Sequence, residues 1–285
     1  MKEIKIASIV NIITNIFLLI IKFAIGFMFN SISILSDAIN SFSDVVASIF
    51  IYFSVKINGK KPDKNHPFGH TRAENIAGYT TGILMIFLAL TICKLAIEKL
   101  ISKSVIEYNY LMLIVIIITL MTKSSLYIYI RSILKKHKSP ALEANMQDHK
   151  NDCIIVIGVL IAIIGIKFGI YILDPLIGLI IALYVFIEGF KICKENVNYL
   201  MGRKASKKML ELIKKTALKI PNVKGTNDLL TQYLGTKIQV EIHIELDKNL
   251  SLKKSHDIGK EVKYAIEALE GINNCFVHID VYGEK

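Results

Sequence analysis

Long apolar runs alternate with short polar connections from the beginning of the chain to residue 202. Each run reaches about 20 residues, the length that an α-helix needs to cross the hydrocarbon core of a membrane. The predicted spans cover residues 7–29, 32–55, 76–97, 110–130, 148–168 and 170–192. The pattern therefore predicts an α-helical membrane bundle of six transmembrane helices.

Beyond residue 202 the pattern changes to that of a small α+β domain. Helical periods run over residues 209–220 and 251–269, and strict alternation over 237–246 predicts a strand with one buried face. With another strand between the first helix and this one, and a third strand over 275–282, the predicted order is αββαβ. We expect a membrane domain over 1–202 and a cytoplasmic domain over 203–285. A domain of this size is marginally stable alone, so pairing with a second copy is expected.

Composition and charge fit a multi-pass protein of the cell membrane. The chain has 285 residues, 53% of them hydrophobic, and a mean hydropathy of +0.48. Basic residues gather at the N-terminus and in the connections 56–72 and 131–138, which places both termini in the cytoplasm. The net charge of +11 is spread over loops and tail. A lipid bilayer, and no nucleic acid, is the expected partner.

Two pairs of polar residues interrupt the second and fifth spans. One pair is Asn40 with Asp44, and the other is Asp148 with Asp152. The spacing of each pair puts both side chains on one face of a helix. An Asp at the centre of a spanning helix costs roughly 2.5–3.5 kcal/mol on insertion scales, so these carboxylates need compensation. Because the two spans run in opposite directions and both pairs fall near the midplane, we expect them to meet and hold a divalent cation.

Two alternatives to a metal site fit the same polar residues. The carboxylates pair with Lys22 or Lys123 inside the bundle, or the helix ends are more hydrated than the pattern indicates. Asp37 lies one turn closer to the outside than Asn40 on the same stripe. It is either a carboxylate beside the site, on the exit path of the ion, or a helix cap.

The ligand types narrow the choice of ion. One amide oxygen and three carboxylates form a hard oxygen set, which suits Mn²⁺, Mg²⁺ or Ca²⁺, whereas imidazole and thiolate favour Zn²⁺ or Cu²⁺. His149 is rotated by about 100° from the face that Asp148 and Asp152 share, so we expect a neighbour and not a ligand. The set therefore argues against zinc as the main cargo.

Two further groups of histidines and carboxylates are candidate metal ligands. The group in the tail comprises His243, His256, His278 and Asp280. The group in the connection between the second and third spans comprises Asp63, His66 and His70. Pro67 and Gly69 argue against a helix there, so this connection holds an ion only by folding locally. The alternative for both groups is solvated histidines, or in the tail histidines satisfied within the core.

Sequence motifs of nucleotide-binding proteins and of hydrolytic enzymes are absent from the chain. The chain has no G-x-x-x-x-G-K-[ST] loop, no H-E-x-x-H and no G-x-S-x-G, so nothing indicates an enzyme or the use of a nucleotide. A passive cation channel needs a continuous polar stripe, whereas the polar residues here gather at one depth. The scattered cysteines Cys93, Cys153, Cys193 and Cys275 indicate neither a disulfide framework nor a thiolate site.

The chain resembles the cation diffusion facilitator family over nearly its whole length. The motifs that carry the resemblance are SDAINSFSD at 36–44, HPFGHTRAE at 66–74, DHKND at 148–152 and VEIH at 240–243. They accompany six spans and a short αββαβ cytoplasmic domain, ferredoxin-like in this family. The resemblance implies a homodimer that exports a divalent metal from the cytoplasm by proton antiport.

The resemblance also assigns the sites. It places the transport site on Asn40, Asp44, Asp148 and Asp152. It assigns the loop group and the tail group described above to metal binding as well. Zinc members usually place a His in one or two of the four transport positions, so this chain looks like the manganese-type branch. Efflux of Zn²⁺, or of Fe²⁺ or Co²⁺, by the same mechanism is the alternative.

Overall fold

The computed structural model describes residues 2–58, 63–103, 105–134, 140–235 and 237–283. It divides into two compact units, one made of residues 1–52 and 80–193 and the other of residues 53–79 and 194–285. Parts of the basic connections, residues 59–62 and 135–139, lie outside the described residues.

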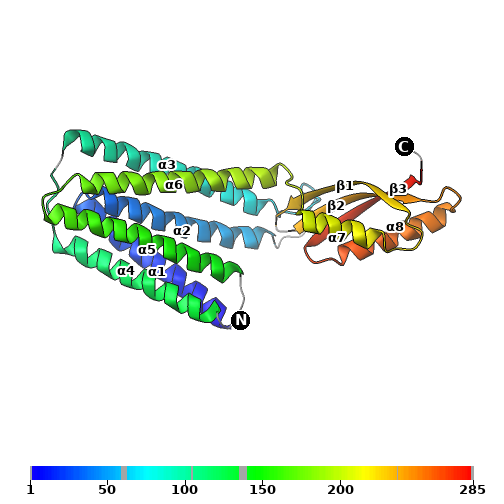
Figure 1. The fold of residues 1–285 in the computed structure, drawn as a ribbon, viewed down its shortest axis with the longest axis horizontal. Coiled ribbons are helices and arrows are strands. Elements are labelled where there is room, and N and C mark those ends of the chain that lie inside the picture. Colours follow the sequence, from blue (N-terminus) through cyan, green and yellow to red (C-terminus); the bar gives the residue numbers. More distant parts are fainter. Residues whose placement is uncertain (1, 59–62, 104, 135–139, 236, 284–285) are drawn as a thin grey trace. The chain divides into compact units, whose positions relative to one another are not determined.

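The described ranges up to residue 202 contain six long helices, as the apolar runs predicted (Figure 1). They are α1 (Lys2–Met28), α2 (Ile32–Asn58), α3 (Ala73–Ser102), α4 (Tyr110–Leu134), α5 (Pro140–Lys167) and α6 (Leu173–Leu200). Within the described part of the chain, four of them, α3 to α6, are long and apolar enough to cross a membrane, and α1 contributes the shorter apolar segment Ile12–Met28. The chain is therefore a multi-pass membrane protein with a helical domain.

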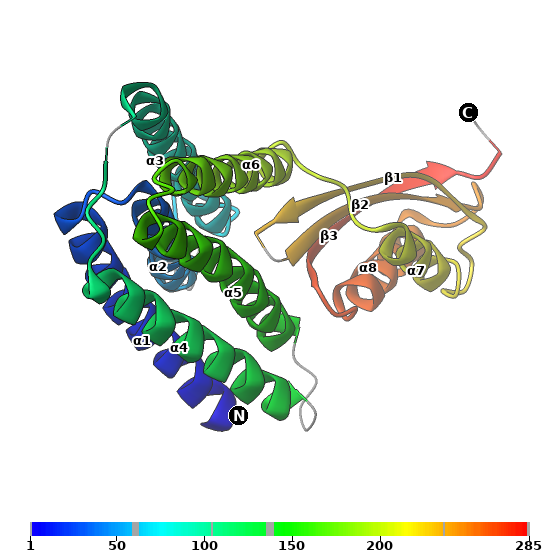
Figure 2. The ribbon, with the colours of Figure 1, turned by 60° about the vertical axis from the view of Figure 1, so that its left-hand side comes forward.

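Apolar side chains fill the inside of the bundle and also cover its outside. Ile34, Ile116 and Ile163 are fully buried in one core, while Phe87 and Phe190 are exposed. An apolar exterior is what a surface facing lipid tails requires. Figure 1 shows α4 and α5 side by side with α1 next to α4, an arrangement that Figure 2 repeats. These three helices carry several of the polar groups discussed below.

Helices α3 and α6 approach each other closely at a pair of glycines. A Cβ atom added to Gly82 would lie 2.6 Å from Cys193 Sγ and 2.8 Å from the carbonyl oxygen of Gly189. Neither distance leaves room for a side chain. Small residues at this crossing let the two backbones pack directly, as is common between helices in membranes.

The beginning of α2 is capped by a residue from α6. Both oxygens of the buried Asp174 accept hydrogen bonds there: Oδ2 from the backbone N–H of Ile32 over 2.8 Å, and Oδ1 from the Ser33 hydroxyl over 2.6 Å. The Ser31 hydroxyl donates to Oδ1 over 2.5 Å. These donors include backbone groups that a helix N-terminus leaves without intrahelical partners. Asp37 lies inside α2 and not at its beginning, so the cap of this helix is Asp174 and not Asp37.

The tail has the predicted αββαβ order. Its elements are α7 (Lys207–Ala217), β1 (Gly225–Leu234), β2 (Lys237–Leu246), α8 (Leu252–Glu267) and β3 (Ile272–Val281). The sheet order is β1-β2-β3, with β1 antiparallel and β3 parallel to the central β2. The two helices begin at Ser206 and Ser251, whose hydroxyls accept hydrogen bonds from backbone N–H groups.

One face of this sheet carries the core of the tail. Alternate residues of β2, among them Val240 and Ile242, are fully buried in one cluster with Ile213 of α7 and Val262 of α8. Both helices accordingly cover the same face of the sheet (Figure 2). The intervening residues of β2, including His243, project from the opposite face. That opposite face is where the histidines of the strands meet.

Candidate metal sites

The second and fifth helices of the bundle meet at Asn40 and Asp152. The Asn40 side chain donates from Nδ2 to Asp152 Oδ1 over 3.0 Å, and both residues are buried. The contact joins α2 to α5 at the two positions that the sequence singled out. Polar side chains predicted to converge within the membrane therefore do so at this point.

The other two proposed ligands lie around this contact. Asp44 is half-buried on α2 and interacts electrostatically with Asp152 and Asp148. Asp148, one turn before Asp152 on α5, is exposed. Among the described residues, these three carboxylates do not form a group whose oxygens all lie within 4.8 Å of one another. A shared ion therefore requires at least one of these carboxylates to move toward the others.

Buried lysines compensate two of the acidic residues. Lys123 of α4 donates to Asp152 Oδ2 over 2.6 Å and to Asn15 Oδ1 over 2.8 Å. Lys22 of α1 lies 2.8 Å from Asp37 Oδ2. Both lysines are 0% exposed. The internal pairing that the sequence left open as an alternative is thus present, and it involves one of the proposed metal ligands.

His149 lies nearer to the site than the helical rotation indicated. Its Nδ1 is 3.9 Å from Asp152 Oδ2, and the side chain is buried. Neither ring nitrogen has a hydrogen-bond partner in the described part of the chain. The spacing of three residues along α5 brings the ring beside the Asp152 carboxylate, although His149 is rotated away from the face that Asp148 and Asp152 share. Sequence reasoning gave no signal for Asn15, which comes from α1.

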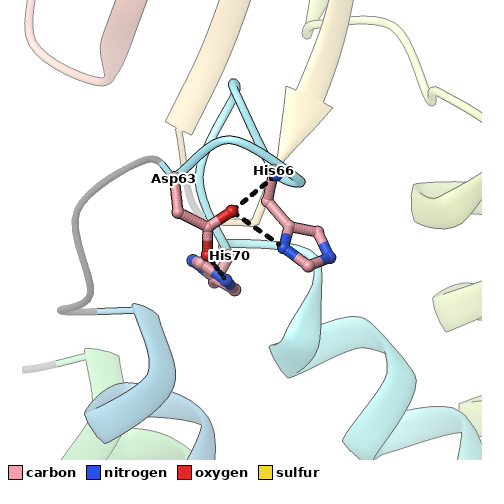
Figure 3. Close-up of side chains that lie close together, drawn as sticks. All are labelled: Asp63, His66 and His70. Atoms are coloured by element: carbon pink, nitrogen blue, oxygen red, sulfur yellow. Dashed lines mark hydrogen bonds and ion pairs between the residues drawn. The ribbon is translucent and has the colours of Figure 1, made fainter.

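The loop between α2 and α3 brings its three candidate ligands together (Figure 3). His66 Nδ1 lies 3.3 Å from Asp63 Oδ1, and His70 Nε2 lies 3.2 Å from Asp63 Oδ2. The ligand atoms all lie within 4.8 Å of one another. The segment is a turn and not a helix, as Pro67 and Gly69 predicted, and Gly69 has a φ of 84°. Local folding has therefore produced an arrangement that one ion can bridge.

Backbone donors keep the loop carboxylate ionised. The N–H groups of His66 and Asn65 donate to Asp63 Oδ1 over 2.7 Å and 2.9 Å. The bond from His66 is the main reason that the pKa of Asp63 lies below its ordinary value. A carboxylate must be deprotonated to bind a metal, so this loop holds Asp63 in the competent form.

A second such group lies on the helix-free face of the tail sheet. His243 of β2 and His278 of β3 are paired in register, with ring centroids 4.5 Å apart. Asp280 contacts both rings: its Oδ2 lies 3.1 Å from His243 Nδ1 and its Oδ1 lies 3.3 Å from His278 Nε2. The three ligand atoms lie within 4.8 Å of one another. The alternation that placed His278 and Asp280 on one face therefore brings them together with His243.

His256, which the sequence placed in the same tail site, is not a member of this group. It belongs to α8, which packs on the opposite face of the sheet from His243. Its Nδ1 lies 3.3 Å from the neighbouring Asp257, and both side chains are exposed. The strand alternation could not reveal this, because it does not say which face of the sheet the helix covers.

Two models of known protein families match the chain. The family model described as the cation efflux transmembrane domain matches residues 8–201, and the one described as the cation efflux protein cytoplasmic domain matches residues 205–282. The chain belongs to the cation efflux family. It is a divalent cation efflux transporter and not an enzyme.

Curated relatives match this cation efflux protein from end to end. An uncharacterized transporter of Methanocaldococcus jannaschii is 40% identical over 99% of both chains. Two manganese efflux system proteins of Bacillus subtilis, MneS and MneP, are 29% and 30% identical, each over 98% of this chain and 96% of its own length. The family is thus established over the full chain, and the identity of the cargo is a separate question.

Proposed function

We propose that this cation efflux protein carries Mn²⁺ out of the cytoplasm in exchange for protons. In this mechanism Asn40, Asp44, Asp148 and Asp152 bind the ion while the bundle is open to the cytoplasm. The bundle then rocks to the outward-open form and releases it. Metal and protons compete for the same carboxylate oxygens, so exchange follows from the chemistry of the ligands. Asp44 or Asp152 carries the proton.

The contact between Asn40 and Asp152 is the observation that carries this proposal. It joins two proposed ligands from different helices over 3.0 Å inside the bundle. One amide and three carboxylates offer hard oxygen donors, which suit Mn²⁺ better than Zn²⁺. The names of the two Bacillus subtilis relatives add independent support for manganese. Zn²⁺, Fe²⁺ and Co²⁺ are the competing cargoes.

The topology belongs to the same proposal. The membrane domain covers residues 1–202 and the cytoplasmic domain 203–285, with both termini on the cytoplasmic side of the cell membrane. Basic residues near the ends of the spans support this orientation. Two copies pair through the cytoplasmic domain to form a homodimer.

We also propose that the tail senses cytosolic metal. An ion held by His243, His278 and Asp280 favours the inward-open form of the transporter, so metal at this site promotes loading at the membrane site. The loop group of Asp63, His66 and His70 is a further binding site that faces the same compartment. The distances within both groups support this role.

Transport into inverted membrane vesicles tests the proposed function. Mn²⁺ uptake should require an imposed pH gradient. The fall in Mn²⁺ uptake on addition of Zn²⁺, Fe²⁺ or Co²⁺ measures how well each of these ions competes for the site. Asp44→Ala and Asp152→Ala should reduce uptake to background while the protein remains folded. Glu98→Ala is the matched control, since Glu98 is an exposed acid on a spanning helix.

Two outcomes of this experiment would contradict the proposal. Retained uptake by both aspartate variants would show that these carboxylates do not bind the cargo. Uptake at an equal rate without a pH gradient would indicate a passive channel.

A further inference from the structure

The Lys123 ammonium is ion-paired with the carboxylate of Asp152, on which the proposed transport site depends. It donates to Asp152 Oδ2 over 2.6 Å, while Asn40 donates to Asp152 Oδ1 over 3.0 Å. Both oxygens of Asp152 thus have protein donors. A divalent cation must take at least one of these oxygens. Because an ammonium and a metal ion at the same carboxylate repel each other, binding of the ion favours movement of Lys123 away from Asp152.

A second acceptor is already in place for the displaced ammonium. Asn15 of α1 accepts from Lys123 Nζ through Oδ1 over 2.8 Å. A lysine at 0% exposure inside a membrane domain requires such a partner, since a buried charge without one is costly. Lys123 can therefore shift from one acceptor toward the other without becoming an unpaired charge.

The charges of the site are consistent with this exchange. When deprotonated, as ligands of a metal must be, Asp44, Asp148 and Asp152 together contribute three negative charges, and Lys123 contributes one positive charge. The remaining charge of minus two matches a single divalent cation. With Lys123 retained nearby on Asn15, the loaded site is neutral. A neutral site has the lowest electrostatic free energy cost in the low dielectric of the bundle while the transporter changes conformation.

We propose that Lys123 is a tethered cation that occupies Asp152 when no metal is bound, and that the metal displaces it toward Asn15. This inference rests on the proposed transport site. Lys123 acts through Asp152 and so is a positioning residue: it lowers the affinity for the cargo and compensates Asp152 while the unloaded transporter returns. A variant that lacks this positive charge should bind the metal more tightly and should carry out the return step more slowly.

Lys22 provides a matched control within the same bundle. It is buried as completely as Lys123 and is ion-paired to Asp37 over 2.8 Å, with Ser41 as a second acceptor at 3.1 Å. Asp37 is not one of the proposed ligands. A substitution of Lys22 therefore removes a buried lysine and its ion pair without releasing a ligand for the metal.

Equilibrium binding of Mn²⁺ to the purified full-length protein is the first test. Lys123→Met should bind at least about tenfold more tightly than the wild type, a change of about 1.4 kcal/mol. Lys123→Arg, which keeps the charge, should restore wild-type affinity, and Lys22→Met should give no tightening. Unchanged or weaker binding by a folded Lys123→Met variant would overturn the inference.

Asn15→Leu gives a test of opposite sign should Lys123→Met not fold. The displaced ammonium then loses its second acceptor, so Mn²⁺ should bind about tenfold more weakly. Binding at wild-type strength or tighter would overturn the inference. This second variant leaves every proposed ligand in place.

Transport in proteoliposomes separates this inference from the proposed function. Lys123→Met should retain exchange of Mn²⁺ for Mn²⁺ but lose net transport driven by a pH gradient, because only net transport needs the unloaded return step. Loss of both together would mark Lys123 as merely structural. The proposed site itself fails on a different result, namely Asp152→Asn binding Mn²⁺ as tightly as the wild type.

Discussion

Asn40 donates a hydrogen bond from Nδ2 to Oδ1 of Asp152, although the two residues lie 112 positions apart in the chain. An amide nitrogen offers no lone pair to a metal, so Asn40 can ligate only through its carbonyl oxygen. In the proposed site, Asn40 therefore has to present this oxygen to the ion. On that proposal, the Asn40 side chain serves both the binding of the ion and the contact between α2 and α5.

Replacement of Asn40 by His should change the selectivity of transport. Imidazole is a better ligand for Zn²⁺ than an amide oxygen is, so Asn40→His should raise Zn²⁺ uptake relative to Mn²⁺ uptake in inverted vesicles. The ratio of the two rates is the measurement, because it does not depend on how much protein the vesicles contain. An unchanged ratio would show that position 40 does not set the preference.

The tail site makes a prediction that separates two histidines. In a protein with Asp44→Ala and Asp152→Ala, so that the membrane site does not contribute, His278→Ala should weaken metal binding at least about tenfold. His256→Ala should leave it unchanged, since His256 contacts Asp257 and not the group on the strands. Titration with Mn²⁺ and Zn²⁺ provides the measurement. Equal losses in the two variants would contradict the assignment.

The crossing of α3 and α6 should tolerate no side chain at Gly82. A methyl group there meets the carbonyl oxygen of Gly189 at 2.8 Å, and a backbone atom cannot move aside easily. We expect Gly82→Ala to lower the free energy of unfolding by about 1–3 kcal/mol. Gly158→Ala is the control, because the nearest atom to its added methyl group would be 3.6 Å away. In detergent, the midpoint of thermal unfolding should be lower for Gly82→Ala than for Gly158→Ala. Equal midpoints would mean that α3 and α6 can move apart at Gly82 without loss of stability.

Cys275 should resist alkylation in the folded protein. Burial, with a smaller contribution from Glu267, raises the pKa of its thiol to about 12. At a pH of about 8 the thiolate that reacts with iodoacetamide is then essentially absent. Mass spectrometry should find Cys275 modified only after unfolding, and modification at equal rates before and after would contradict this.

The same shift has a consequence for stability. The raised pKa means that the folded state holds the thiol proton more tightly than the unfolded state does. The contribution of this thiol proton to the free energy of unfolding is therefore complete below the ordinary thiol pKa of 9.0. It is lost as the pH rises toward about 12. Cys275→Ala should remove this part of the alkaline instability.

The spans, the order of the tail elements and the convergence of α2 with α5 were predictable because each depends on periodicity. Apolar runs, alternation over β2 and polar residues spaced four apart all appear within one segment of sequence. The partners of the buried charges were not predictable to the same degree. Nothing near Lys123 indicates that Asn15 accepts its hydrogen bond, because the two come from helices whose packing no local pattern specifies. His256 was misassigned for a related reason, since the face covered by α8 is decided by tertiary packing.

The capping of α2 by Asp174 bears on the order in which the protein is assembled during synthesis. The donors at Ser31, Ile32 and Ser33 are made early, yet their acceptor is encoded more than 140 residues later. Until α6 emerges and inserts, the start of α2 lacks its native acceptor, while Lys22 of α1 and Asp152 of α5, which contact α2 further along, are already made. A nascent chain that stops before Asp174 therefore leaves these donors without their native acceptor, so the beginning of α2 reaches its final capped form only when α6 is in place.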